Sequence, residues 1–421
     1  MSKANSQQPP VNLFDAEVQR CPYPAYQQLR DEAPVFECPA TGMFVVTRFD
    51  DVRTVLTDTT NFVNDASLRM ASRPVTDRQK AVIELFESEG WLPAPTLAGR
   101  DNPEHKQMRA IFNQAFRPKV VNRLDPEVRD LAYGLINDFI DDGHCEFVRQ
   151  FAIPLPLVII GRQMGADPAD IWKIKEWTEA FFHRIGMMLD PAQELDTVRK
   201  EIEAQHYFQP IFERLRKEPN NTLLSELVNT VIEEWGRPLN DNELHAEMMA
   251  DTFVGGSETT TNALSAGVKL LIENKDVWEQ LKSDPEKYAK IFIEEVLRLE
   301  SPVQSLMRVT ANDVELSGTV IPAGSMVNVR YGAANRDERR FDEPEKIDLE
   351  RKTPGGHMAF GSGVHHCLGA PLARRELIWS FTALAEKVDD MWFAEDKNTF
   401  DYHPHYLLRS LKELHIGFKP Q

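Results

Sequence analysis

Hydrophobic residues recur at helical spacing through the middle of the chain. Between about residues 102 and 300, apolar positions follow the period of roughly 3.6 that marks one face of a helix. Prolines interrupt this pattern, and each is expected to separate one helix from the next. The interruptions lie at Pro118, Pro154, Pro156, Pro168, Pro191 and Pro219.

Short β elements are predicted outside this region. Residues 44–47 form an apolar run between Gly42 and Asp50 and predict a strand. Residues 314–331 predict a small hairpin followed by a further strand. Prolines and glycines then predict an irregular region over 344–363, and a helix is expected over about 371–387. We therefore expect a mainly α protein with a minor β part.

One long helix is predicted over about 241–273. Asn240 or Asp241 can cap it, and some thirty residues at ~1.5 Å each span roughly 45 Å. The run 255–260, Gly-Gly-Ser-Glu-Thr-Thr, lies in its middle and is rich in poor helix formers. Such a run either opens a local bulge, which often marks function, or lets two helices pack closely.

Composition excludes several classes of protein. The chain has 421 residues and a net charge of −18, with no basic block, so a nucleic-acid partner is not expected. Four cysteines without a paired pattern favour the reducing cytoplasm. No apolar segment has the length of a membrane anchor, and no glycine-rich dinucleotide fingerprint is present. We expect a disordered tail over 1–10 and a single domain over 11–421, monomeric and without a fused reductase.

The most informative stretch is 360–369, Phe-Gly-Ser-Gly-Val-His-His-Cys-Leu-Gly. It presents Cys367 just ahead of a predicted helix, where free N–H groups and the helix dipole favour a thiolate. A thiolate is a good soft ligand for haem iron. The alternatives are an inert buried cysteine, or a zinc site with His365 and His366. The remaining cysteines form no CxxC pair and disfavour zinc: Cys21, Cys38 and Cys145.

Two further pairs have helical spacing. His105 and Arg109 lie at i and i+4, and Glu295 and Arg298 lie at i and i+3. Taken alone, each pair is also typical of an ordinary solvated helix face.

The cysteine stretch resembles the haem-binding loop of the cytochrome P-450 family, Phe-Gly-x-Gly-x-His-x-Cys-x-Gly, with every fixed position filled. The resemblance extends from about residue 20 to 418, with the motifs in the family's order. It implies haem b, iron protoporphyrin IX, between the long central helix and the Cys-loop helix. Cys367 would be the axial iron ligand.

The resemblance also assigns roles to other positions. Residues 255–259 resemble the family's oxygen-activating groove, in which Glu258 is the acid and Thr259 the alcohol that deliver protons; Gly255 replaces the commoner alanine. The haem propionates would be bound by His105, Arg109, Arg308 and His365. A structural triad beneath the haem would comprise Glu295, Arg298 and Arg351.

The implied reaction is monooxygenation of an apolar small molecule with O2, on a terpenoid, steroid, fatty-acyl or aromatic substrate. The alternatives are a peroxide-driven peroxygenase or decarboxylase, and a non-catalytic haem-thiolate ligand-binding protein. Because peroxygenases tend to lack the acid–alcohol pair, Glu258 and Thr259 favour the monooxygenase. The expected pocket residues are Phe86, Trp91, Leu92, Phe182, Ile185, Met188, Phe253, Gly255, Val303, Leu306 and Leu407, with Phe181, Met187, Met307, Tyr406 and Leu408 nearby.

Without a reductase of its own, the chain is expected to receive electrons from NAD(P)H through a ferredoxin reductase and an iron–sulfur ferredoxin. Basic residues flank the cysteine loop in sequence and could form a positive patch for an acidic ferredoxin. They are Lys106, Arg109, Arg117 and Lys119 on one side, and Arg339, Arg340, Lys346, Arg351, Lys352, Arg374 and Arg375 on the other.

Overall fold

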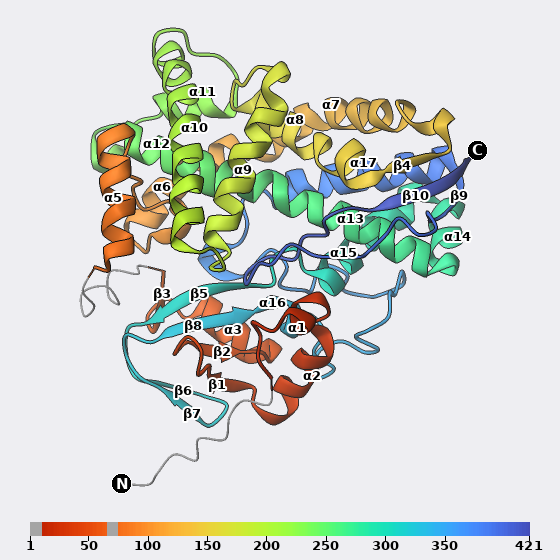
Figure 1. Ribbon diagram of the computed structural model, residues 1–421, viewed down its shortest axis with the longest axis horizontal. Helices are drawn as coiled ribbons and strands as arrows, with labels where there is room; N and C mark the ends of the chain where they lie inside the picture. The colour runs from red at the N-terminus through yellow and green to blue at the C-terminus, as the bar shows by residue number, and fades with distance from the viewer. Residues whose placement is uncertain (1–10, 65–74) are drawn as a thin grey trace.

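The computed structural model describes residues 11–64 and 75–421. The tail predicted over 1–10 lies outside the described residues. Helices fill the larger part of the molecule, and a sheet built from the first quarter of the chain and residues 305–330 lies beside them (Figure 1). This is the mainly helical architecture with a minor β part that the hydrophobic pattern predicts. In the described part of the chain, no helix has the length and apolar character needed to cross a membrane.

Three of the predicted breaks coincide with the starts of α-helices. Pro118, Pro154 and Pro191 each occupy a first turn, where the missing N–H has no intrahelical partner to lose. The α-helices are α1 (Ala16–Arg20), α2 (Tyr23–Glu32), α3 (Phe49–Thr57), α5 (Asp77–Glu89), α6 (Glu104–Ala115), α7 (Pro118–Asn137), α8 (Pro154–Gln163), α9 (Ile171–Ile185), α10 (Pro191–Lys217), α11 (Leu223–Asn229), α12 (Asp241–Glu247), α13 (Thr259–Glu273), α14 (Lys275–Ser283), α15 (Pro285–Glu300), α16 (Tyr331–Ala334) and α17 (Ala370–Lys387). Short 3₁₀ turns are η1 (Leu97–Gly99), η2 (Ile140–Asp142), η4 (Pro168–Asp170), η5 (Glu233–Trp235) and η7 (Gly363–His365), and π-helical segments are η3 (Val148–Ala152) and η6 (Met248–Glu258).

The strands form three small sheets in the described chain. The largest has the order β1-β2-β8-β5-β3, the second β4-β10-β9, and the third is the predicted hairpin β6-β7. Their bounds are β1 (Val35–Glu37), β2 (Phe44–Val46), β3 (Phe62–Val63), β4 (His144–Glu146), β5 (Ser305–Thr310), β6 (Val314–Leu316), β7 (Thr319–Ile321), β8 (Met326–Arg330), β9 (Val388–Phe393) and β10 (His415–Pro420). In the antiparallel β5–β8 pair, Leu306 and Arg308 lie two residues apart and so share one face of the strand.

The predicted long helix is continuous but not uniform. Asn240 caps it through a capping box with Glu243, and α12 then passes into the π-helical η6 before α13 resumes the α-helix. The π-helical turns contain Gly255 and Gly256, so of the two alternatives left open by the sequence the structure has the local bulge. Further along, a Cβ at Gly267 would lie 2.3 Å from Phe381, so glycine permits the close approach of α13 to α17.

Three side chains predicted to form a structural triad do meet: Glu295 and Arg298 of α15, and Arg351. The Arg298 guanidinium donates Nε–H and Nη2–H to the two carboxylate oxygens of Glu295, both at 2.8 Å. Arg351 donates to the same carboxylate at 2.9 Å. The side chains of Glu295 and Arg298 are fully buried, so the pair is shielded from water.

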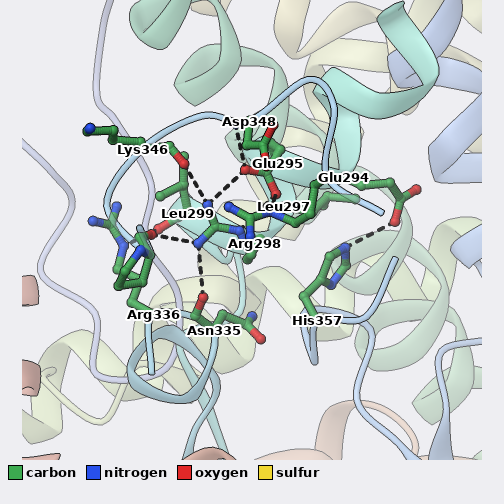
Figure 2. Close-up of polar contacts among 12 residues, drawn as sticks. Glu294, Glu295, Leu297, Arg298, Leu299, Asn335, Arg336, Lys346, Asp348 and His357 are labelled. Atoms are coloured by element: carbon green, nitrogen blue, oxygen red, sulfur yellow. Dashed lines mark hydrogen bonds and ion pairs between the residues drawn. The ribbon is translucent and has the colours of Figure 1, made fainter. Parts of the chain in front are cut away.

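The remaining donors of Arg298 hold an irregular segment of backbone in place (Figure 2). Nη1 donates to the carbonyls of Asn335 and Pro344, and Nη2 donates to that of Lys346. The adjacent residue, Glu294, binds His357 at 3.0 Å and accepts two hydrogen bonds from Arg374. Helix α15 is therefore bonded to backbone and side-chain groups before the cysteine loop and to the Arg374 side chain after it.

Replacing Arg298 by methionine is predicted to destabilise the fold by about 3–5 kcal/mol, because it leaves a buried carboxylate without its main partner. The measurement is the free energy of unfolding in urea. Arg53 provides a matched control, since it also pairs at i,i+3 spacing, with Asp50, but on the surface. Arg53→Met should change the free energy by no more than about 0.5 kcal/mol. Equal losses in the two variants would contradict a special role for the buried pair.

Candidate active site

A large cavity lies between the central helix and the cysteine loop. Its volume is about 520 Å³, and its exposed lining is mostly apolar. Residues of η6 and α13 form one wall, and the segment 359–369 with the first turns of α17 forms the opposite wall. The segments 302–308 and 407–408, residues 97–98 and side chains of α6 and α9 form further parts of the lining.

Cys367 lies on the wall formed by the loop, with its side chain open to the cavity. Its backbone N–H donates to the carbonyl of Phe360 at 2.9 Å, and its sulfur accepts from the N–H groups of Gly369 and Ala370. Burial raises the pKa of the thiol, although those N–H groups and nearby arginine charges oppose the rise. The helix start thus favours the thiolate, as expected. When no cation is bound, however, burial has the larger effect on the pKa of Cys367.

The glycines of the loop are required by its path. Gly361 and Gly363 have φ values of 69° and 70°, which side chains other than glycine rarely adopt. A Cβ on Gly363 would also lie 2.6 Å from the carbonyl oxygen of Leu56. Arg109 fastens the same loop from α6, donating to the carbonyls of Val364 and His366 at 3.2 and 2.6 Å.

The four predicted propionate partners line one cavity. His105, Arg109, Arg308 and His365 come from three separate parts of the chain and all border it. The rings of His105 and His365 are 4.1 Å apart, and Arg308 is buried beside them. Burial, followed by the neighbouring charges of His105 and Arg308, lowers the pKa of His365 to about 3. The histidines are therefore neutral, and the charges of Arg109 and Arg308 make the rim electropositive and suited to carboxylates.

The same residues provide a test of whether haem fits. His105 is 3% exposed, yet its Nε2 has no hydrogen-bond partner among the described residues. A buried, unpaired polar atom is costly unless a ligand completes it. Haem would fit this site. Its iron would bind the sulfur of Cys367, and its propionates would bind His105, Arg308 and their neighbours.

Thr259 and Glu258 point in different directions. Thr259 lines the cavity and donates its hydroxyl to the carbonyl of Gly255 at 2.8 Å. Glu258 does not line it; its carboxylate binds Lys175 at 2.6 Å and Thr178 at 3.2 Å, both on α9. The acid and the alcohol are thus neighbours in sequence, with the buried acid held against α9, away from the cavity.

Two carboxyl groups that border the cavity are not identified from the sequence. Glu376 on α17 borders the cavity and bonds Thr260, and burial raises its pKa to about 8. In the sequence it follows two arginines and resembles a surface residue. Asp251 also borders the cavity, where its carboxylate accepts from the N–H of Ala98. No sequence pattern singles out either residue.

Five of the predicted pocket residues do line the cavity. They are Ile185, Gly255, Val303, Leu306 and Leu407, and the nearby Phe181 and Leu408 join them. Phe181 and Ile185 lie at i and i+4 and so share one face of α9.

Three predictions between residues 86 and 92 are wrong. Phe86 packs against α10 in a separate apolar cluster, Trp91 contacts the rings of His206 and His245, and Leu92 is exposed. The chain instead reaches the cavity at Leu97 and Ala98, where Glu247 and Asp251 of the central helix accept the backbone N–H groups of this turn.

Three further pocket predictions are wrong because they choose the wrong helix face or a surface position. Phe182 turns away from the cavity onto His405, with ring centroids 4.2 Å apart. Phe253 packs on Phe208 inside the core. Met188 lies on the surface at 38% exposed.

The geometry does not support a zinc site. Within residues 11–64 and 75–421, no group of three or more histidine, cysteine or acidic side chains is arranged to hold a metal ion. A single sulfur facing a wide cavity instead suits a cofactor such as haem, whose porphyrin supplies the other donors to the metal.

Comparisons with known proteins agree with this geometry. The family model for cytochrome P-450 matches residues 160–387. Vitamin D(3) 25-hydroxylase of Pseudonocardia autotrophica is 31% identical, over 97% of this chain and 97% of its own. Cytochrome P-450 monooxygenase PikC of Streptomyces venezuelae is 32% identical, over 94% of this chain and 91% of its own.

Solved structures match over nearly the full chain. The polyketide synthase cytochrome P-450 PksS of Bacillus subtilis 168 is 28% identical with a TM-score of 0.84, covering 97% of this chain and 100% of its own. Cytochrome P-450 CYP109Q5 of Chondromyces apiculatus is also 28% identical, with a TM-score of 0.83 and 98% of each chain covered. The cysteine loop, the cavity and this similarity lead to one conclusion: the chain belongs to the cytochrome P-450 family of haem b monooxygenases.

Proposed function

We propose that this monooxygenase inserts one oxygen atom from O2 into an apolar small molecule and receives its electrons from NAD(P)H through a ferredoxin reductase and a ferredoxin. The observation that carries the proposal is the sulfur of Cys367, which faces the cavity and accepts two backbone N–H groups. Haem bound there supplies the oxygen activation and the electron chemistry. The protein supplies the sulfur ligand, the protons and the shape of the pocket.

The cavity lining supports an apolar substrate. Above the cysteine wall, the substrate would contact mainly aliphatic and aromatic side chains. They include Leu97, Phe181, Ile185, Val254, Val303, Leu306, Leu407 and Leu408. Relatives named as a vitamin D(3) 25-hydroxylase and a steroid C26-monooxygenase act on large, mostly apolar molecules. A terpenoid, steroid, fatty-acyl or aromatic substrate fits the same description, and a sugar or nucleotide does not.

Proton delivery is assigned to Thr259 and Glu258. The Thr259 hydroxyl borders the cavity, where it can pass a proton to the reacting oxygen, and its bond to Gly255 fixes its position. Glu258, buried against α9, can relay protons toward Thr259 once its bond to Lys175 opens. The placement of Thr259 favours this reading over a peroxide-driven enzyme, which has no need of such a hydroxyl, and over a ligand-binding protein.

The ferredoxin would dock over the cysteine loop. Of the basic residues near it in sequence, several are engaged: Arg374 pairs with Glu294, Arg375 with Asp125, and Arg339 with Asp31. Others are exposed and form no ion pair with a described residue, namely Lys106, Arg117, Lys119 and Lys352. These cations support a docking site for an acidic partner, against the net charge of −18 of the whole chain.

Three parts of the proposal rest on the sequence. They are a single catalytic domain over 11–421, a monomeric state and a cytoplasmic location. A free ferredoxin would meet such a protein by diffusion, with electrostatic attraction raising the rate of encounter.

Cys367→Ala is predicted to abolish the Soret band of a thiolate-ligated haem in the reduced, carbon monoxide-bound protein, because no other described sulfur lines the cavity. Absorption spectra of the purified variants provide the measurement. Cys145→Ala serves as the control, since Cys145 is buried but does not line the cavity, and the variant should leave the band intact. Persistence of the band in Cys367→Ala would refute the ligand assignment.

Thr259→Ala is predicted to keep substrate binding but to lower the yield of product per electron consumed by about 10²-fold or more, because the variant lacks the proton-donating hydroxyl. The measurement compares product formed with NAD(P)H oxidised and peroxide released. Thr261→Ala, two residues along the same helix, removes a hydroxyl that bonds Ala152 outside the cavity and should stay coupled. Equal coupling in both variants would argue against the role of Thr259.

Reduction by an acidic ferredoxin is predicted to slow steeply with added salt, since the Debye length falls from ~10 Å at 0.1 M to ~3 Å at 1 M. Stopped-flow reduction rates provide the measurement. Lys106→Glu and Lys352→Glu should slow reduction without changing substrate affinity, whereas Lys217→Glu, at the end of α10, should leave the rate unchanged. Arg374→Glu is unsuitable, because Arg374 holds the buried Glu294. A salt-independent rate, unchanged in the two variants, would eliminate this docking model.

A further inference from the structure

The active-site cavity has one acidic side chain on the wall formed by the central helix. Asp251 lies four residues before Gly255 and eight before Thr259, and all three residues line the cavity. This spacing places them on one face of the helix. Asp251 is partly exposed, although burial is the largest influence on the pKa of its carboxyl group. Its accessible surface therefore faces the cavity and not bulk water.

Asp251 is paired with a second, more deeply buried acid. Glu247 lies one turn earlier on the central helix, is 1% exposed and does not line the cavity. The two carboxyl groups share a hydrogen bond. Glu247 also accepts the backbone N–H of Leu97, and Asp251 accepts that of Ala98 at 3.1 Å. The pair therefore fastens the turn η1 to the central helix.

Glu247 holds the proton of this pair. Burial, followed by the charge of Asp251, raises the pKa of Glu247 well above its ordinary value. Burial also raises the pKa of Asp251, but three hydrogen bonds oppose that rise. Their donors are the N–H of Ala98, the hydroxyl of Thr96 and the carboxyl group of Glu247. Protonated Glu247 therefore donates to Asp251, and the negative charge of the pair is located on Asp251.

The protein does not supply a cation to balance this charge. Among the described residues, no lysine or arginine forms an ion pair with Asp251 or Glu247. Arg100 acts on Glu247, but its guanidinium is already paired with Glu104 and Glu243. A carboxylate inside a protein is costly unless an opposite charge or hydrogen bonds compensate it. A further donor would therefore stabilise Asp251.

The carboxylate of Asp251 has room for such a donor. A carboxylate has two oxygens with about four acceptor positions in all. The three donors from the protein leave one position free on a side chain that faces the cavity. We propose that Asp251 is a specificity-determining residue whose carboxylate accepts a hydrogen bond from a hydroxyl or a protonated amine on an otherwise apolar substrate.

This inference rests on the proposed function, and it narrows the substrate class. In an α-helix the eight residues from Asp251 to Thr259 would span about 12 Å at ~1.5 Å each, and the wider π-helical turns of η6 shorten this span. The donor group would therefore lie at the far end of the substrate from the carbon that reacts near Thr259. A long terpenoid or steroid with a remote hydroxyl or amine meets this requirement. A fatty acid with its carboxylate at this end does not, because like charges repel.

The test uses alkylimidazoles as probes. An imidazole binds haem iron directly and brings its alkyl tail into the substrate cavity, so the natural substrate need not be known. Tails of increasing length end in methyl, hydroxyl, dimethylammonium or carboxylate. The measurement is the Kd of each probe for the haem-loaded protein, obtained from the shift of the Soret band.

At one tail length, the hydroxyl or the dimethylammonium probe should bind about tenfold tighter than the methyl probe, and the carboxylate probe should bind more weakly than methyl. Preference for dimethylammonium would identify an amine as the substrate group, and preference for hydroxyl would identify an alcohol. Equal Kd values for the methyl, hydroxyl and dimethylammonium probes at every tail length would overturn the proposal.

Variants assign the preference to one side chain. Asp251→Leu should remove it, and a preference that survives in this variant would overturn the proposal. Asp251→Asn keeps an acceptor for the N–H of Ala98, so it remains informative if Asp251→Leu does not fold. It should weaken the preference, because an amide oxygen carries no charge. An unchanged preference in Asp251→Asn would count against the proposal.

Two further variants provide controls. Asp196→Asn, at an exposed position of α10, should retain the preference. Glu247→Gln should also retain it, because its amide can donate to Asp251 as the protonated carboxyl group does. Loss of the preference in Glu247→Gln would contradict the location of the charge on Asp251.

Failure of the proposed function would give a different result. If even the methyl probes do not shift the Soret band, the haem site is not the one described, and the proposed function and this inference are both wrong. If the methyl probes bind and the terminal group has no effect on the Kd, the role of Asp251 alone is wrong.

Discussion

The active site depends on keeping a sulfur anion inside the protein. Burial alone raises the pKa of the Cys367 thiol, so the thiolate needs compensation from every side. The backbone N–H groups of Gly369 and Ala370 and the charges of Arg109 and Arg374 provide part of it. The bound iron would provide the rest, because a metal ion favours the deprotonated ligand. The loop geometry and the helix start at α17 are the means by which the chain holds this sulfur in place.

Two adjacent residues of α15 organise the surroundings of that loop. The carboxylate of Glu295 accepts from Arg298 and Arg351, and Arg298 holds the backbone between residues 335 and 346. Glu294 binds His357 before the loop (Figure 2) and Arg374 after it. Although burial would raise its pKa, the bonds from these two partners lower the pKa of Glu294 to about 2, so it stays ionised. One turn of helix thus joins both flanks of the cysteine loop to the core.

The sequence predicts those features that depend on local chemistry. Capping at Asn240, helix starts at prolines and the glycine loop around Cys367 each follow from residue type and spacing. Side-chain direction on a helix is harder, as Phe182 shows: its neighbour Phe181 faces the cavity, and a shift of one residue turns a side chain by about 100°. Glu376 and Arg330 show a further limit. Their polar side chains are buried by elements distant in sequence, which no local pattern reveals.

The most direct test of the account is the iron coordination of the purified protein, measured by X-ray absorption at the iron edge. The account predicts one sulfur neighbour in addition to the porphyrin nitrogens, contributed by Cys367. Iron bound only by nitrogen and oxygen ligands, for example through the imidazole of His365 or His366, would contradict it, as would purified protein that takes up no haem.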